Sequence, residues 1–186
     1  TSLDGLYNLK KITGNFITWE ACITSYEGID KLTEIGGDFE VRLPYSLESF
    51  EGLESLETIG GNFKVIDKLA LSSLSSFKGL SSLKSIGGDF EVKARVLESF
   101  EGLENLTNIG DKLTIKGCSS LNNIDALKNI ESLNDISITT CSKLYDFCVL
   151  KNVVQNMSGT FYVNDNGYNP TKYQLLNGEC SQIPQE

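Results

Sequence analysis

A repeat of 23 to 27 residues constrains this 186-residue chain more than any other feature of its sequence. LESFEGLE occurs at 47–54 and again at 97–104, and IGGDFEV occurs at 35–41 and 86–92. Together they define a unit SFxGLxxLxxIGGxFxV, and a chain of such similar units folds by stacking each unit on the next. The first apolar residue of the unit occurs seven times, at Leu3, Tyr26, Phe50, Phe77, Phe100, Ile124 and Phe147.

Each part of the unit predicts a local structure. The FxV element alternates with period two, which is typical of a half-buried strand. The Gly-Gly pair before it predicts a bend that needs positive φ or a close approach of two backbones. The GLxxL element predicts a short turn of helix or 3₁₀ helix packed inward. Two internal aromatic stacks follow, one of Phe16, Phe39, Phe63 and Phe90 and the other of Tyr26, Phe50, Phe77 and Phe100.

The fifth and sixth units carry a spaced pattern of leucine, isoleucine and glycine, at Leu103, Leu106, Ile109, Gly110, Leu113, Ile115, Leu121 and Ile124. This pattern resembles the receptor L-domain family, the leucine-rich β-helices of insulin-receptor-like and EGF-receptor-like ectodomains. The tail, with DFCVLK, GTFYV, NGYNPT and NGEC, is similar to the ends of Bacteroides-type leucine-rich surface proteins. The resemblance implies a fold far more specifically than a function.

The expected fold is therefore mainly β: a right-handed parallel β-helix or leucine-rich solenoid of about seven coils, with short helical or 3₁₀ turns and a C-terminal helical cap. A single domain covers 1–186. It divides into a first coil or N-cap (1–25), central coils (26–146), and the last coil with the cap (147–186).

Composition excludes several classes of function. The net charge of −9 argues against nucleic-acid binding, which depends on Lys and Arg neutralising phosphates. The chain has no histidine, which removes Ser-His-Asp and Cys-His catalysis and the commonest zinc ligand. Each Gly-Gly pair precedes a predicted strand rather than a helix N-terminus, so none forms a phosphate-binding loop. We expect no catalytic residue, no cofactor and no metal site.

The five cysteines indicate an oxidising compartment. Cys148 opens the last coil and Cys180 lies in the tail, so a disulfide between them would hold the tail over the end of the solenoid. Cys118 and Cys141 occupy equivalent positions of successive coils, about 4.8 Å apart, and either a disulfide or two buried thiols fits. Cys22 is left as a buried or free thiol.

The tail also predicts the capping helix. Asn169 is placed as its N-cap, with Pro170 at the first helical position. The helix would extend from Thr171 to Asn177 and end at Gly178. A recognition tail is the functional alternative.

Two columns of polar residues recur along the chain. One follows the first aromatic residue of each unit and is mostly acidic: Asp4, Glu27, Glu51, Lys78, Glu101, Asp125 and Cys148. It could bind calcium or a basic partner, but carboxylates about 5 Å apart in a single row do not converge on one ion, which favours a solvated face. The other column is Asn15, Asp38, Asn62 and Asp89, whose alternation of amide and carboxylate avoids stacking like charges and indicates a stabilising role.

If the FxV side chains point inward, two columns point outward from the sheet. The first is Ile17, Glu40, Lys64, Glu91, Thr114, Ser137 and Tyr162, and the second is Trp19, Arg42, Ile66, Lys93, Lys116, Thr139 and Asn164. Glu40, Lys64 and Glu91 alternate in sign, so we expect them to pair with one another.

Apolar side chains at the N-terminal corner of this face suggest a partner surface. Arg42 lies between Trp19 and Ile66, where a cation–π contact with Trp19 is expected. Trp19 either anchors a partner or folds over the open first coil as part of an N-cap. The predicted partner surface consists of Ile17, Trp19, Arg42, Ile66, Lys93 and Tyr162.

Three functions compete for such a chain: a non-enzymatic cell-surface binding or adhesion module for a protein or glycan, a structural spacer of a surface protein, and a β-helix enzyme acting on polysaccharide. The acidic residues recur unit by unit, whereas a catalytic pair should break the repeat, so the enzyme is the weakest of the three. We expect an exported, surface-exposed protein whose targeting segment and any membrane anchor lie outside this chain. Caps at both ends would favour a monomer.

Overall fold

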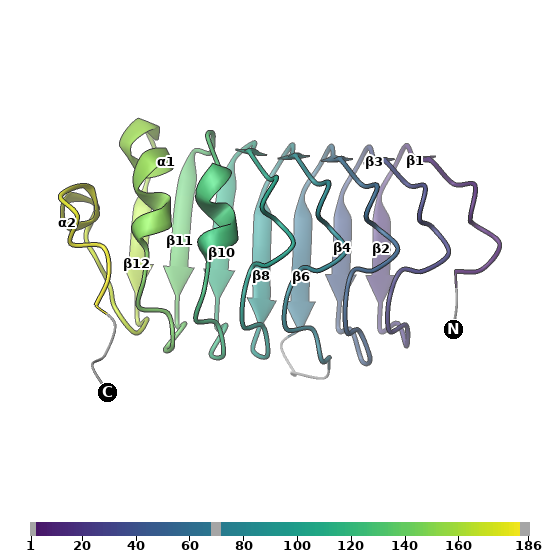
Figure 1. Ribbon diagram of the computed structural model, residues 1–186, viewed down its shortest axis with the longest axis horizontal. Coiled ribbons are helices and arrows are strands. Elements are labelled where there is room, and N and C mark those ends of the chain that lie inside the picture. The colour runs from purple at the N-terminus through teal and green to yellow at the C-terminus, as the bar shows by residue number, and fades with distance from the viewer. Residues whose placement is uncertain (1–2, 68–71, 183–186) are drawn as a thin grey trace.

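The chain forms a parallel β-solenoid, described in a computed structural model over residues 3–67 and 72–182 (Figure 1). A long sheet has the strand order β12-β11-β10-β8-β6-β4-β2, and a narrow sheet of two-residue strands has the order β1-β3-β5-β7-β9. The pairs recorded within both sheets are all parallel, which confirms the predicted mainly-β solenoid. Seven strands of the long sheet are joined by six turns of the chain.

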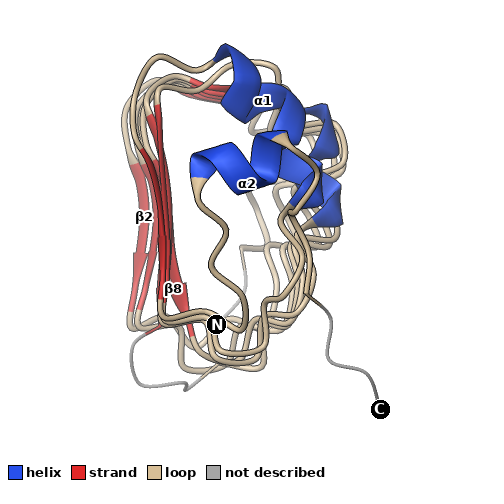
Figure 2. Ribbon diagram, turned by 90° about the vertical axis from the view of Figure 1, so that its left-hand side faces the viewer, coloured by secondary structure: helices blue, strands red, loops and turns tan. Residues whose placement is uncertain are grey.

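The strands of the long sheet carry the predicted FxV elements. They are β2 (Phe16–Trp19), β4 (Phe39–Arg42), β6 (Phe63–Asp67), β8 (Phe90–Ala94), β10 (Lys112–Lys116), β11 (Asp135–Thr139) and β12 (Phe161–Asn164). The narrow sheet consists of β1 (Lys11–Ile12), β3 (Glu34–Ile35), β5 (Thr58–Ile59), β7 (Ser85–Ile86) and β9 (Asn108–Ile109). Viewed along the solenoid axis, the long sheet forms one side of the cross-section and the turns and helices form the opposite side (Figure 2).

Both predicted aromatic stacks are confirmed. Within the first, the Phe39 and Phe63 rings stack with centroids 5.0 Å apart, and Phe63 and Phe90 stack at 5.1 Å. The second continues from Phe50 to Phe77 at 5.6 Å, and rings of the two stacks meet edge to face at 5.7 to 6.2 Å. This alternation is the packing that aromatic quadrupoles favour, and it leaves the interior filled by side chains.

The glycines of the repeat have two different roles. A Cβ on Gly60 would lie 2.3 Å from the carbonyl oxygen of Gly36, and one on Gly87 would lie 2.1 Å from that of Gly60. The Gly-Gly pairs therefore permit close backbone approach between coils. Positive φ occurs instead at the glycine of the GLxxL element, as at Gly52 (95°).

That second glycine also decides where the predicted helical turns form. Coils with glycine there, such as the one containing Gly52, form consecutive turns with bonds from the Leu53 and Leu56 amides to carbonyls three residues earlier. Ala126 and Val149 stand at the same position in the last two coils. There the chain forms 3₁₀ helices, η1 (Asp125–Asn129) and η2 (Cys148–Leu150), and η2 leads into α1 (Lys151–Asn156). A residue with a Cβ avoids positive φ and allows the helical conformation.

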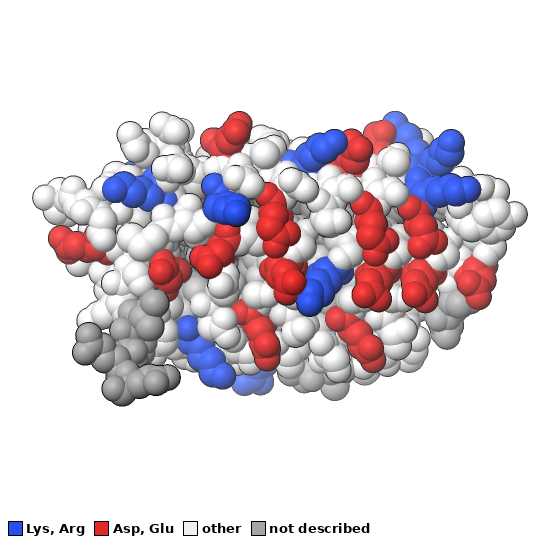
Figure 3. All heavy atoms as spheres, in the orientation of Figure 1, with Lys and Arg blue, Asp and Glu red and all other residues white. Residues whose placement is uncertain are grey.

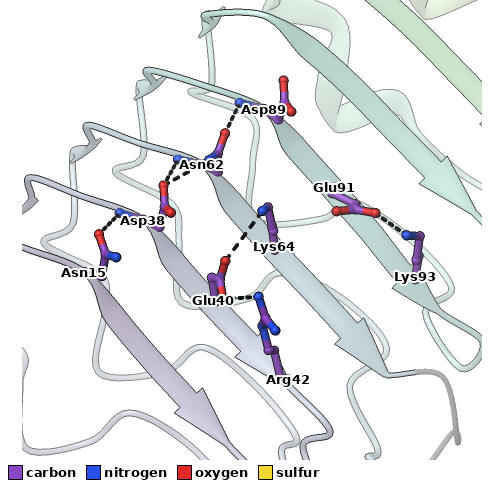
Figure 4. Close-up of polar contacts among 9 residues, drawn as sticks. All are labelled: Asn15, Asp38, Glu40, Arg42, Asn62, Lys64, Asp89, Glu91 and Lys93. Carbon is purple, nitrogen blue, oxygen red and sulfur yellow. Dashed lines mark hydrogen bonds and ion pairs between the residues drawn. The ribbon is translucent and has the colours of Figure 1, made fainter.

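The column of Asn and Asp forms the stabilising ladder that its alternation predicts (Figure 4). Asn15 Oδ1 accepts a bond from the Asp38 amide at 2.9 Å, and Asp38 Oδ1 accepts bonds from the Asn62 amide at 2.7 Å and its side chain at 3.0 Å. Asn62 Oδ1 accepts from the Asp89 amide at 2.8 Å. Each side chain thus joins two coils at the bend before the long strand.

The C-terminal tail folds back over the end of the core, as predicted, and the Cys148–Cys180 disulfide is present. Its helix, α2, spans Lys172–Leu176, and Gly178 follows it with φ of 90°. The predicted N-cap is wrong: Thr171 caps α2 instead of Asn169. Pro170 therefore lies before the helix rather than at its first position, and Asn177 is the C-cap rather than the last helical residue. Only Thr171 has a glutamine three residues later, and Gln174 completes a capping box with it.

Candidate binding surface on the long sheet

The outward columns of the long sheet have the predicted register. Ile17 lies beside Glu40, Glu40 beside Lys64, and Lys64 beside Glu91 on successive strands. The second column likewise aligns Trp19 with Arg42, Arg42 with Ile66, and Ile66 with Lys93. Because residues of one strand alternate between the two faces of a sheet, both columns project away from the aromatic core.

Charges on this face pair mostly within single strands (Figure 4). Glu40 is buried and forms two ion pairs: its Oε2 lies 2.6 Å from Nη2 of Arg42, and its Oε1 lies 3.5 Å from Nζ of Lys64. Glu91 pairs with Lys93 of its own strand. The predicted pairing is therefore right for Glu40 with Lys64 and wrong for Glu91, since Lys93 is two residues along the same strand and points to the same face.

The environment of Trp19 corrects two further expectations. Trp19 is 64% exposed, so it does not fold over the first coil as a cap. The expected cation–π contact with Arg42 also does not form among the described residues, because the guanidinium turns to Glu40 instead. A charge-assisted hydrogen bond is stronger than an exposed cation–π contact. Nε of Arg42 is buried without a hydrogen-bond partner among the described residues, so the pair does not use the side-on arrangement in which Nε also donates.

Two adjoining shallow hollows lie on this face. The first has a volume of about 400 Å³ and is lined by Trp19, Arg42, Leu43, Lys64, Ile66, Glu91 and Lys93. The second, of about 410 Å³, is lined by Asp67, Lys93, Arg95, Lys116 and Gly117. Lys93 contributes to both, so the hollows form one groove that crosses the strands.

Four of the six residues of the predicted partner surface meet in the first hollow: Trp19, Arg42, Ile66 and Lys93. Ile17 lies on the same face but outside the lining, and Tyr162 lies on β12 at the other edge of the sheet. The predicted partner surface omitted the other lining residues, which are Leu43, Lys64, Asp67, Glu91, Arg95, Lys116 and Gly117. Of these, Lys64, Glu91 and Lys116 were placed in the outward columns. The sequence signal for Arg95 is its spacing of two residues from Lys93, which places both side chains on the same face if the strand continues beyond its expected end.

Two glutamates outside the acidic column stabilise the turns on the opposite side. Gly52 and Gly102 have positive φ, and their amides donate to the carboxylates of Glu54 and Glu104 at 3.0 to 3.2 Å. Glu101 pairs with Lys78, which interrupts the column, at 3.4 Å. Among the described residues, no group of three or more Cys, Asp and Glu side chains is arranged to hold a metal ion.

The remaining cysteines are thiols. Cys118 and Cys141 are both fully buried, so the thiol alternative describes this structure, and Cys22 is exposed. A hydrogen bond between the two buried side chains lowers the pKa of Cys118 and raises the pKa of Cys141, which burial raises further.

Comparisons with known proteins give no family for this chain: no protein-family model, no curated protein and no solved structure matches it. None of the helices in the described residues is long and apolar enough to cross a membrane.

Proposed function

We propose that this protein is a non-enzymatic, cell-surface binding or adhesion module that recognises a protein or glycan through the outer face of its long sheet. The observation that carries the proposal is the groove lined by Trp19, Arg42, Ile66 and Lys93. It places an exposed indole and an arginine together, and these residue types dominate binding energy at interfaces. The parallel solenoid is also compatible with the L-domain-like and Bacteroides-type surface proteins that the sequence resembles.

Export to an oxidising compartment is the second part of the proposal. The Cys148–Cys180 disulfide supports it, since such bonds persist mainly outside the cytosol. Thiol quantitation on the denatured, unreduced protein tests this part. Three reactive thiols of five correspond to the disulfide alone, and one corresponds to additional oxidation of Cys118 with Cys141. Five reactive thiols in protein purified from its own cells would contradict export.

The binding proposal is tested by screening the purified protein on arrays of glycans and extracellular proteins. For any ligand found, Trp19→Ala and Arg42→Ala should each weaken binding by about 2 kcal/mol or more. Tyr173→Ala is the matched control, because Tyr173 is 75% exposed on α2 at the C-terminal end. If all three variants bound the ligand as tightly as the wild-type chain, the proposed site would be contradicted. Turnover of a polysaccharide would favour the enzyme function instead.

A structural spacer is the alternative function, and one observation favours it. Arg42, Lys64 and Lys93 already pair with Glu40 or Glu91 on the sheet face. A surface charge that is already in an ion pair contributes little binding energy to a partner unless it leaves that ion pair on binding. A spacer would bind nothing on either array, yet its removal would shorten the reach of the protein that carries it.

A further inference from the structure

The cationic side chains of the long sheet are concentrated in the groove. We define them as the cationic strip, which consists of Arg42, Lys64, Lys93, Arg95 and Lys116. Among the described residues, three acids lie with them, Glu40, Asp67 and Glu91, so the described part of this surface has two more basic than acidic side chains. The chain as a whole has 16 basic and 25 acidic residues. The opposite face carries rows of Asp and Glu with Lys and Arg side chains among them (Figure 3).

The C-terminal half of the strip has the most available charge. Arg95 and Lys116 are exposed, and neither forms an ion pair with another described residue. Lys116 aligns with Thr139 on β11, so no carboxylate stands at that position of the next strand. At the other half, Glu40 is shared between Arg42 and Lys64, so a single carboxylate serves two cations.

The groove has the shape of a track rather than a pocket. It crosses β2, β4, β6, β8 and β10 from Trp19 to Lys116, which is four strand spacings, or about 19 Å at ~4.8 Å per strand. A small molecule is normally enclosed on most sides by its site. An open track of this length fits a linear polymer that lies along the solenoid axis.

We propose that the ligand of this groove is an acidic polysaccharide, bearing carboxylate or sulfate groups, that runs across the strands from Trp19 to Lys116. This inference rests on the proposed binding function and names the class of its ligand. The anionic groups pair with Arg95, Lys116 and Lys93, and Trp19 offers its flat apolar surface to the face of a sugar ring. Trp is suited to this contact because it combines a large apolar surface with one polar group.

Two other anionic polymers fit the groove less well. Peptides that bind sheets add a strand at an exposed edge, whereas the groove lies on the face of the sheet, where the backbone groups already pair with neighbouring strands. Single-stranded nucleic acids stack successive bases on several aromatic side chains, whereas Trp19 is the only aromatic side chain among the described residues that line the groove.

The test measures binding of a heparin decasaccharide and of oligogalacturonate, with dextran, polyglutamate and a dT oligonucleotide as comparisons. The wild-type chain should bind the two acidic glycans, bind dextran at least tenfold more weakly, and lose affinity as salt rises. Arg95→Glu/Lys116→Glu should weaken glycan binding at least tenfold. Both side chains are exposed and form no ion pair with the part of the chain that the structure describes, so the variant should keep the wild-type circular dichroism spectrum and melting temperature.

A matched control carries the same change of charge elsewhere. Lys10→Glu/Lys128→Glu reverses two exposed lysines outside the groove and should change affinity less than twofold. Equal loss in both double variants would show nonspecific charge attraction and overturn the inference. Tighter binding of polyglutamate or the oligonucleotide would also overturn it while leaving a binding function in place. Failure of the wild-type chain to bind any glycan or extracellular protein would remove the proposed function as well.

Discussion

The two ends of the solenoid are built from the same repeat and finish in different ways. At the C-terminal end, the tail places Leu175 and Cys180 in the core and is tied back by the Cys148–Cys180 disulfide. At the N-terminal end, the first coil keeps the repeat's apolar positions without a comparable cover among the described residues. Leu6 is 46% exposed there, whereas Leu53 at the same position of a central coil is fully buried.

The difference shows which constraints of the repeat come from stacking on both sides. Thr13 occupies the first-coil position at which later coils have Gly36 and Gly60. A side chain fits there because no other coil of the described residues lies against it on that side, whereas Gly60 contacts the Gly36 backbone. In the coils that carry the Gly-Gly pair, the glycines therefore meet the backbone of the preceding coil, and the first coil has no such neighbour among the described residues.

The disulfide carries the largest expected effect at the C-terminal end. Cys148→Ser/Cys180→Ser opens a link between residues 32 positions apart, which should lower the free energy of unfolding by about 3–4 kcal/mol. Denaturant unfolding measures the loss, and hydrogen exchange should rise first in α2 and leave β2 unchanged. Cys22→Ser is the control, because Cys22 is an exposed thiol and its change should be near zero. Uniform loss of protection along the solenoid would mean that the two ends are not independent.

The glycine column gives the sharpest contrast between a stacked and an unstacked coil. Gly61→Ala brings a Cβ within 2.3 Å of Asp38 Oδ1 and 2.8 Å of the Gly37 backbone, so it should destabilise by about 2–3 kcal/mol. Gly14→Ala changes the same position of the first coil, where nothing lies within 4 Å, and should alter stability by less than about 1 kcal/mol. Thermal and denaturant unfolding of the two variants measures both changes in stability. Similar losses would show that the first coil is covered in solution.

A smaller effect is expected from the cap of the terminal helix. Thr171→Ala removes the hydroxyl that accepts the Gln174 amide at 3.2 Å, and loss of such a cap costs about 1 kcal/mol. Exchange of the α2 amides should accelerate while the central strands keep their protection. Tyr173→Ala changes an exposed residue of the same helix outside the capping box and should leave exchange nearly unchanged.

Most of the fold follows from the repeat, because its period, its aromatic columns and its outward columns are all set by sequence spacing. The GLxxL turns were harder to predict, since one residue, Gly52 or Ala126, decides between consecutive turns and a 3₁₀ helix. The groove was only partly predictable. Register placed Arg42 beside Trp19, but spacing along a strand cannot say that Glu40 takes the guanidinium, because that choice depends on side-chain rotamers and on competing partners.

The smallest expected effect separates the two ends of the polar ladder by pH. At the N-terminal end the ladder begins with the neutral Asn15, while near the C-terminal end Asp135 accepts bonds from the hydroxyl and amide of Thr160. Those bonds hold the pKa of Asp135 below its ordinary value of 3.8. A carboxylate with a lowered pKa stabilises the fold fully at pH values above its ordinary pKa, and this contribution is lost as the pH falls through the lowered pKa.

NMR titration between pH 5 and pH 2 should therefore shift the Thr160 amide signal with a midpoint below 3.8. The Asp38 amide donates to the neutral Asn15 side chain, so that hydrogen bond should add no such transition to the Asp38 amide signal. Asp135→Asn keeps an acceptor oxygen, as Asn62 does toward Asp89, and should abolish the Thr160 transition without unfolding the last coil. A midpoint at or above 3.8 would show that these bonds do not favour the ionised form.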